Sequence, residues 1–106
     1  MIMMTLNSKQ RKLLEKHANR IDPVVIVGAG GVSEGVTGKI DTDIGHHELI
    51  KVKFNDFKDE KRELTEGITD ATGATLVRLI GNVAILYRPA KEAKDRKYEK
   101  ELNKLS

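Results

Sequence analysis

Apolar residues recur every three or four positions in three stretches of the chain, and this spacing predicts three amphipathic helices. A polar N-cap residue precedes the first two helices, and a glycine suited to a left-handed C-cap ends the second and the third. The expected limits are Asn7 or Ser8 to about Ala18, Ser33 to Gly45, and Asp59 to Gly73. The apolar stripes are Leu13, Leu14 and Ala18; Val36, Ile40 and Ile44; and Leu64, Ile68 and Ala71.

Four further segments have the periodicity of strands, namely residues 24–27, 48–54, 76–80 and 83–87. The first is an unbroken apolar run, which predicts a short, fully buried strand. The second alternates, so that Lys51 and Lys53 lie opposite its buried face. The last two flank Gly81 and Asn82, a two-residue turn typical of tight hairpins.

The predicted order of elements is α-β-α-β-α-β-β. This order indicates an α/β fold, an α+β sandwich with a small four-stranded mixed sheet. We expect a single domain over residues 1–90. The remainder, residues 91–106, is a charged tail whose large aliphatic residues are Leu102 and Leu105. We expect this tail to be a loosely held helix or disordered.

Three glycines in four residues, over Gly28–Gly31, lie between a predicted strand and a predicted helix. Because glycines have no side chain, a phosphate can approach their backbone amides closely. The N-terminus of the following helix also favours an anion. A dinucleotide fingerprint would require glycine at Ser33, and a P-loop would require lysine at Val36. What remains is a GxxG pattern, which clamps the nucleic-acid backbone in KH-type modules. The alternative is that the glycines only permit a tight turn.

Charge is distributed unevenly along the chain, although the net charge is only +3. Residues 1–20 hold five basic groups and one acid, whereas residues 41–70 hold nine acids and five bases. If the basic segments meet in space, the protein has one basic and one acidic face; otherwise these are solvated surface charges. With two Phe, two Tyr and no Trp, the chain cannot build an aromatic base-stacking sheet, so RNA would be held by backbone and shape contacts.

Catalytic and metal-binding patterns are lacking in the sequence. The chain has no cysteine, and the adjacent His46 and His47 at a helix–strand junction point in different directions. We therefore expect no enzymatic activity, no cofactor, no metal site and no small-molecule substrate. The chain has no apolar run long enough to span a bilayer and no signal-peptide pattern at its start, so a soluble, cytoplasmic monomer without a membrane partner is expected.

Several motifs in order along residues 5–90 together resemble one family. They are Leu6 with Ser8–Arg11, Pro23–Gly28, Gly31–Val36, His46–Lys53, Thr72–Ala74 and Leu86–Pro89. This combination resembles the CRM domain (chloroplast RNA splicing and ribosome maturation), and more narrowly the bacterial single-domain YhbY-type RNA-binding proteins.

The resemblance implies a fold similar to the C-terminal domain of translation initiation factor three. It also implies binding of ribosomal RNA in precursors of the large ribosomal subunit, and of group II intron RNA in plant relatives. The RNA-contacting residues would be the loop with nearby basic residues: Gly28, Ala29, Gly30, Gly31, Lys9, Arg11, Lys12, Lys51, Lys53 and Arg88. The loop centre is Ala29-Gly30, without a polar side chain, so backbone amides would make its contacts. A protein-interaction adaptor that uses the acidic 41–70 region and the tail is the alternative.

Overall fold

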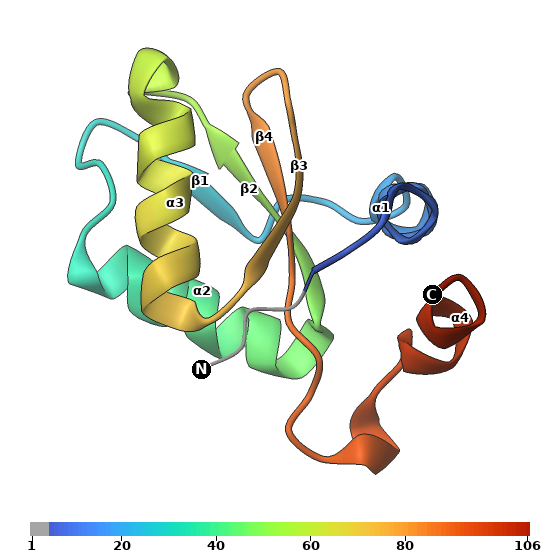
Figure 1. The fold of residues 1–106 in the computed structure, drawn as a ribbon. Helices are drawn as coiled ribbons and strands as arrows, with labels where there is room; N and C mark the ends of the chain where they lie inside the picture. Colours follow the sequence, from blue (N-terminus) through green and yellow to red (C-terminus); the bar gives the residue numbers. More distant parts are fainter. Residues whose placement is uncertain (1–4) are drawn as a thin grey trace.

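The computed structural model describes residues 5–106, which form a four-stranded mixed sheet with helices on both faces (Figure 1). This confirms the predicted α-β-α-β-α-β-β order, to which a short C-terminal helix is added. In chain order the helices and strands are α1 (Ser8–Ala18), β1 (Val25–Val27), α2 (Glu34–His47), β2 (Leu49–Phe54), α3 (Lys61–Thr72), β3 (Thr75–Ile80), β4 (Val83–Tyr87) and α4 (Glu99–Lys104).

The strands lie in the order β1-β2-β4-β3. β1 pairs in parallel with β2 through the α2 crossover, whereas β2–β4 and β3–β4 are antiparallel. β1 is therefore an edge strand, and the prediction that it is fully buried is wrong. Val25 and Val27 are buried, but Ile26 points to the other face and is 56% exposed.

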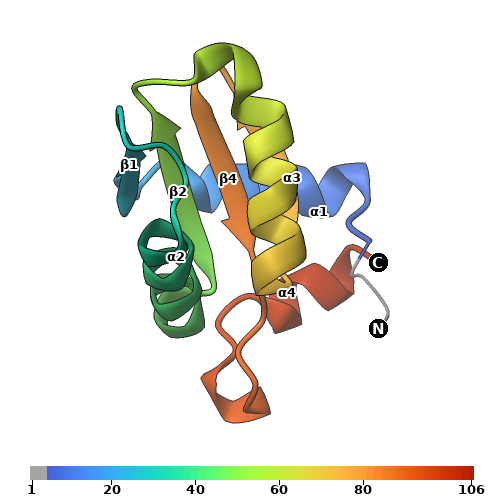
Figure 2. The same cartoon turned by 90° about the vertical axis from the view of Figure 1, so that its left-hand side faces the viewer.

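Each face of the sheet carries its own apolar core. One core contains β-strand residues packed against α2 and α3, including Ile40, Ile44 and Ile68. The other contains Leu14 and Ala18 of α1 and Leu102 of α4. Figure 2 shows α2 and α3 in front of the sheet, and α1 and α4 behind it. Within residues 5–106, no helix has both the length and the apolar character needed to cross a bilayer.

Local capping explains where the first two helices begin. Asn7 forms a capping box with Gln10, each side chain accepting from the other residue's backbone N–H. Ser33 Oγ accepts from the Val36 N–H at 3.3 Å. The predicted end of α2 at Gly45 is wrong, because α2 continues to His47. The residue with positive φ at the C-terminus of α2 is Glu48, at φ 63°.

The third helix begins later than Asp59, since a 3-10 turn over Lys58–Glu60 precedes it. Its stripe also differs from the prediction, because Ala71 is exposed. Threonines take its place, with Thr65, Thr69 and Thr72 buried beside Ile68. Each of their hydroxyls donates to a backbone carbonyl three or four residues earlier, which satisfies the buried polar atom.

The C-terminal segment is packed onto the domain rather than loosely held. Leu102 on α4 is 4% exposed and belongs to the core under α1. Asn7 Nδ2 donates to the Leu105 carbonyl at 2.7 Å, and Gln10 Nε2 donates to the Leu102 carbonyl at 3.0 Å. The sequence did not predict this packing, because one buried leucine, Leu102, does not form a recognisable apolar stripe. The domain boundary near residue 90 stays a prediction.

Glu48 fastens this segment to the sheet. Its side chain is buried, and the carboxylate accepts from the backbone N–H groups of Ala90 and Lys97. Its own carbonyl accepts from the Arg88 N–H at 2.9 Å. A buried carboxylate needs such donors, since an unpaired charge in the interior is strongly unfavourable.

Tyr87 lies in the same region, fully buried, with its ring 6.2 Å from that of Tyr98. Burial, and then the negative charge of Glu48, raise the pKa of Tyr87 to about 12.

The raised pKa of Tyr87 predicts how stability depends on pH. Between pH 10 and 12 the folded chain keeps a proton on Tyr87 that the unfolded chain has lost, so the free energy of unfolding falls as pH rises. We expect Tyr87→Phe to remove about 1–3 kcal/mol of this fall. Melting temperatures of the wild type and the variant, measured between pH 9 and 12, test this prediction. An equal fall of melting temperature with pH in the two proteins would contradict it.

Candidate nucleic-acid interface

The segment Gly28–Gly31 forms a tight turn at the end of β1. The Gly31 N–H donates to the Gly28 carbonyl at 3.0 Å. Gly31 has φ 69°, and a Cβ there would lie 3.3 Å from Cε2 of Phe57. The turn therefore requires glycine at position 31 for conformational reasons, and this residue by itself is no evidence for a ligand.

Ala29 and Gly30 differ from Gly31, since the turn does not require them to be small. A Cβ on Gly28 or Gly30 would meet no heavy atom within 4 Å, and neither glycine has positive φ. Ala29 and Gly30 are exposed. Within residues 5–106, neither of their N–H groups donates to a backbone or side-chain acceptor. Two exposed amides at the tip of the turn are thus available to an outside acceptor such as a phosphate oxygen.

The start of α2 adds a second set of donors. Helix N-termini carry unpaired N–H groups and a partial positive charge, which stabilise an anion. Glu34 lies in the first turn of α2 and places a carboxylate near this end. The tip of the turn, at Ala29 and Gly30, is therefore a better phosphate position than the helix start itself.

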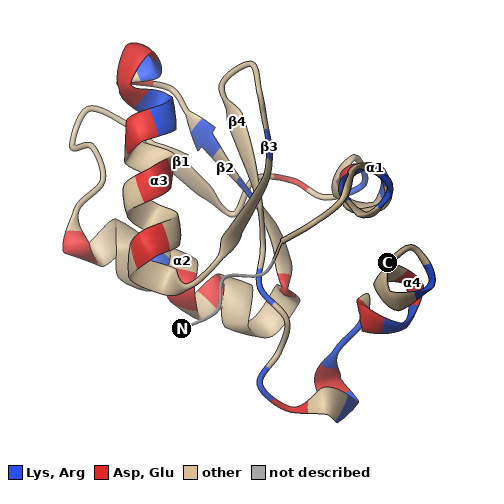
Figure 3. Cartoon of the chain, in the orientation of Figure 1, with Lys and Arg blue, Asp and Glu red and all other residues tan. Residues whose placement is uncertain are grey.

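Residues 55–60 form a second loop against the glycine turn. The N–H groups of Asn55 and Asp56 donate to the Val27 carbonyl at 3.0 and 3.1 Å. Phe57 follows at φ 54°, and its ring lies beside Gly31. Sequence reasoning did not place this aromatic residue beside the turn, because the contact joins segments 26 residues apart. Figure 3 shows both charge signs near the start of α3, so the surroundings of the turn are not uniformly basic.

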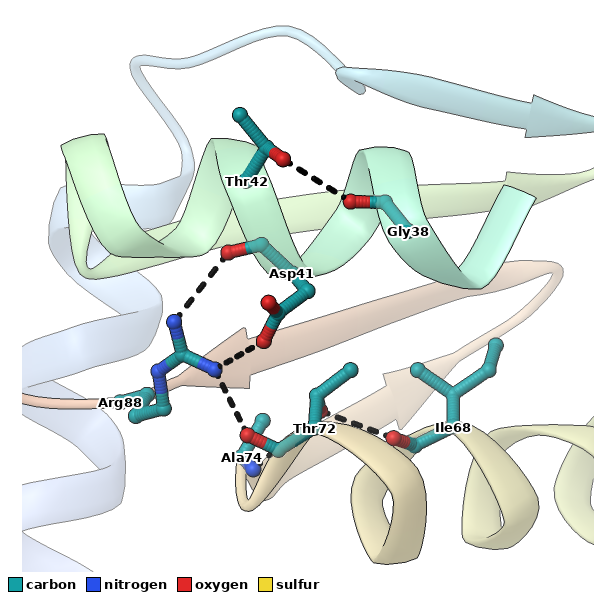
Figure 4. Close-up of polar contacts among 7 residues, drawn as sticks. All are labelled: Gly38, Asp41, Thr42, Ile68, Thr72, Ala74 and Arg88. Carbon is teal, nitrogen blue, oxygen red and sulfur yellow. Dashed lines mark hydrogen bonds and ion pairs between the residues drawn. The ribbon is translucent and has the colours of Figure 1, made fainter. Parts of the chain in front are cut away.

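The Arg88 guanidinium forms hydrogen bonds within the fold. Its Nη1 donates to Asp41 Oδ1 and to the Thr72 carbonyl, both at 2.6 Å, and its Nη2 donates to the Asp41 carbonyl at 3.1 Å (Figure 4). The guanidinium thereby links α2 to the end of α3. An arginine with these partners has little capacity left for a phosphate.

Arg11 is engaged in a similar way. Its Nη1 donates to the carbonyls of Leu76 and Val77, at 2.7 and 2.6 Å, and its Nε donates to the Leu6 carbonyl. The pairing of β3 with β4 shifts register between Leu76 and Arg78. Arg11 thus satisfies carbonyls at a bulge, where the ladder is interrupted.

The four predicted lysines lie together on one side of the molecule. Lys9 and Lys12 are exposed on α1, and α1 packs on the sheet face to which Lys51 and Lys53 point. Figure 1 places α1 and the glycine turn on opposite sides of the sheet. The lysines and the turn therefore do not form one flat patch, and a ligand touching both must cross the β1 edge.

The histidines and carboxylates of the described residues were the candidates for a metal site. Among the residues that the structure describes, no three His, Asp or Glu side chains converge as they would to hold a metal ion. His46 and His47 are exposed at the end of α2.

Residues 6–88 match the model of the CRS1 / YhbY (CRM) domain. The chain is 42% identical over 93 residues to a Haemophilus influenzae protein named "RNA-binding protein", covering 87% of this chain and 94% of that one. It is 32% identical over 90 residues to "Probable RNA-binding protein YqeI" of Bacillus subtilis, covering 84% and 94%.

The fold is also similar to the solution structure of SAV1595 from Staphylococcus aureus. The TM-score is 0.71 at 39% sequence identity, and the match covers 88% of this chain and 98% of that one. With a matching family model over most of its length and relatives of this identity, the chain belongs to the CRS1/YhbY (CRM) domain family.

Proposed function

We propose that this protein binds RNA, and that its RNA is ribosomal RNA in precursors of the large ribosomal subunit. The observation that carries RNA binding is the pair of unpartnered amides at Ala29 and Gly30, in a chain whose relatives are named RNA-binding proteins. The ribosomal target rests on the resemblance to YhbY-type proteins. In this proposal the protein is not an enzyme, and it works in the cytoplasm as a monomer.

The glycine turn supplies N–H donors to a phosphate, while Lys9, Lys12, Lys51 and Lys53 neutralise others. Arg11 and Arg88 contribute indirectly, since they fix α1 and α2 relative to the sheet. Contacts of this kind read backbone and shape more than sequence.

The adaptor alternative depends on the acidic region, of which the fold engages only a part. Glu48 is buried, Asp41 pairs with Arg88, and Asp43 pairs with Lys39 at 2.7 Å. The other acids of residues 41–70 are exposed on and just before α3, namely Asp56, Asp59, Glu60, Glu63, Glu66 and Asp70. We favour RNA over an adaptor role because the relatives are named RNA-binding proteins.

Salt dependence tests the electrostatic part of the proposal. If about four phosphates are neutralised, log K on single-stranded RNA should fall with log salt at a slope near −3. Lys51→Gln with Lys53→Gln should reduce the slope by about 1.4, because two phosphate contacts are lost. Filter binding between 50 and 300 mM KCl measures both values.

The matched control is Lys91→Gln with Lys94→Gln, two exposed lysines on the C-terminal segment. This control removes the same charge and should leave the slope unchanged. A wild-type slope near zero, or equal losses in the two double variants, would contradict a phosphate-binding role for the β2 lysines.

A further inference from the structure

A row of side chains crosses all four strands on the α1 side of the sheet. The pairing register aligns Ile26 with Lys53, Lys53 with Val83, and Val83 with Ile80. Directly paired residues point to the same face, so these four side chains form one line across the sheet. We call this line, which consists of three aliphatic residues and Lys53, the aliphatic row.

Residues 5–106 leave most of the aliphatic row uncovered, with Val83 partly buried. Ile26 is 56% exposed and Ile80 is 47% exposed, and Lys53 is exposed as well. Figure 1 shows why, because α1 and α4 cover the other part of this face and leave the end near the β3–β4 turn open. Ile26 and Ile80 lie on the two edge strands, β1 and β3, at either end of the row, and large exposed aliphatic side chains on one face form a surface that can bind an apolar group.

The charge beside the row selects the kind of partner. The next line of residues on this face pairs Lys51 with Ile85 and Ile85 with Arg78. Lys51, Lys53 and Arg78 are thus the charged strand residues on this face, and all are cationic. Glu15 of α1 lies 3.3 Å from Arg78 and offsets one of them. A partner with flat apolar surfaces and regular negative charge fits this pattern, and single-stranded RNA has both.

The row is also continuous with the glycine turn. Ile26 is two residues before Gly28, and β1 is the edge strand nearest the turn. Three inter-strand spacings give the row a length of roughly 14 Å. A strand of RNA held by phosphate at Ala29 and Gly30 can therefore pass over the β1 edge and onto the sheet.

We propose that the aliphatic row is a base-binding platform for single-stranded RNA, in which Ile26, Val83 and Ile80 contact base faces and Lys51 and Lys53 contact phosphates. This inference rests on the proposed RNA-binding function. It links the turn to the lysines of α1, which lie on the same side as the row, and it replaces the usual aromatic side chains with aliphatic ones.

The experiment compares two labelled probes of about 12 nucleotides, an oligoadenylate and an abasic oligoribonucleotide of equal length and charge. The full chain should bind the oligoadenylate at least about tenfold more tightly, since only this probe offers bases. Ile26→Thr with Ile80→Thr should reduce this preference to below about threefold while leaving affinity for the abasic probe unchanged. Threonine keeps the β-branched shape, and both sites are exposed, so the fold should be retained.

Two further variants complete the test. Ile80→Phe should raise the preference for the oligoadenylate, because an aromatic ring stacks on a base better than an aliphatic chain. Ala71→Thr, exposed on α3 across the sheet, should change nothing. Equal wild-type affinity for both probes, or full preference in the double threonine variant, overturns the platform while RNA binding stands. Binding of neither probe at low salt also overturns the platform, and failure to bind ribosomal RNA under the same conditions overturns the proposed function itself.

Discussion

Replacing Leu102 by alanine should lower the melting temperature by about 10–20 °C. Leu102 is almost fully buried among residues of α1 and the sheet, including Leu14 and Tyr87. Truncating a buried leucine to alanine removes about 2–4 kcal/mol, through lost burial and the cavity left behind. In a domain of about 100 residues each kcal/mol shifts the melting temperature by roughly 4–8 °C. Thermal unfolding followed by circular dichroism measures the effect.

Leu105→Ala is the matched control, since Leu105 closes the same helix but remains partly exposed. We expect less than about half the shift of Leu102→Ala. Deleting residues 91–106 should destabilise the domain at least as much as Leu102→Ala, because Leu102 and the Lys97 N–H that donates to the Glu48 carboxylate are both lost. If Leu102→Ala melts within about 2 °C of the wild type, the segment is the loosely held tail that its composition suggests.

The elements that the sequence predicted well are those set by neighbours along the chain. The N-caps at Asn7 and Ser33 need only a side-chain oxygen three residues before its donor. The alternation in β2 and the left-handed turn at Gly73 are equally local. Because such signals lie within a few residues, they are visible in the sequence itself.

The features that the sequence did not predict depend on distant contacts. Glycine at position 45 resembles a helix stop, yet the chain turns at Glu48, whose carboxylate accepts hydrogen bonds from residues 42 and 49 positions further along. A glutamate at positive φ is unusual, and these contacts fix it in place. Ile26 was expected to be buried because a short apolar run does not show that β1 lies at the edge of the sheet.

The candidate interface shows the same division. Lys51 and Lys53 share a face because they lie two apart on a strand, which the sequence predicts. Arg11 and Arg88 are indistinguishable in sequence from free cations, and only the carbonyls and the carboxylate that they contact show their role in the fold. Since those partners come from β3, α2 and α3, no local pattern could have separated the two arginines from the lysines.

This separation gives the interface a definite layout. Fixed arginines hold the helices, exposed lysines supply charge on one face, and the glycine turn supplies amides at the β1 edge. Substituting Arg88 would therefore affect RNA binding through loss of the α2–α3 link, and a melting curve would show it. Only substitutions at exposed, unpartnered positions report on binding alone, and the turn offers the best of these.

Gly30→Asp should weaken RNA binding at least about tenfold, or about 1.4 kcal/mol, while the fold survives. A side chain at position 30 meets no heavy atom within 4 Å, and the backbone there does not have positive φ, so the turn can accept aspartate. Its carboxylate would lie at the tip of the turn and repel a phosphate drawn to the amides of Ala29 and Gly30. Filter binding to ribosomal RNA measures affinity, and circular dichroism with thermal unfolding serves as the fold control.

Gly30→Asn and Ala29→Lys separate charge from bulk. Asparagine has the shape of aspartate without its charge, so we expect it to retain most of the affinity if repulsion is the cause. Ala29→Lys adds a cation at an exposed position of the same turn and should hold or improve binding. Equal losses in Gly30→Asp and Gly30→Asn would show that the backbone must be approached closely, as a phosphate held by amides requires. Unchanged binding in a well-folded Gly30→Asp protein would mean that Gly28–Gly31 only reverses the chain, and that RNA binds through the sheet and α1 alone.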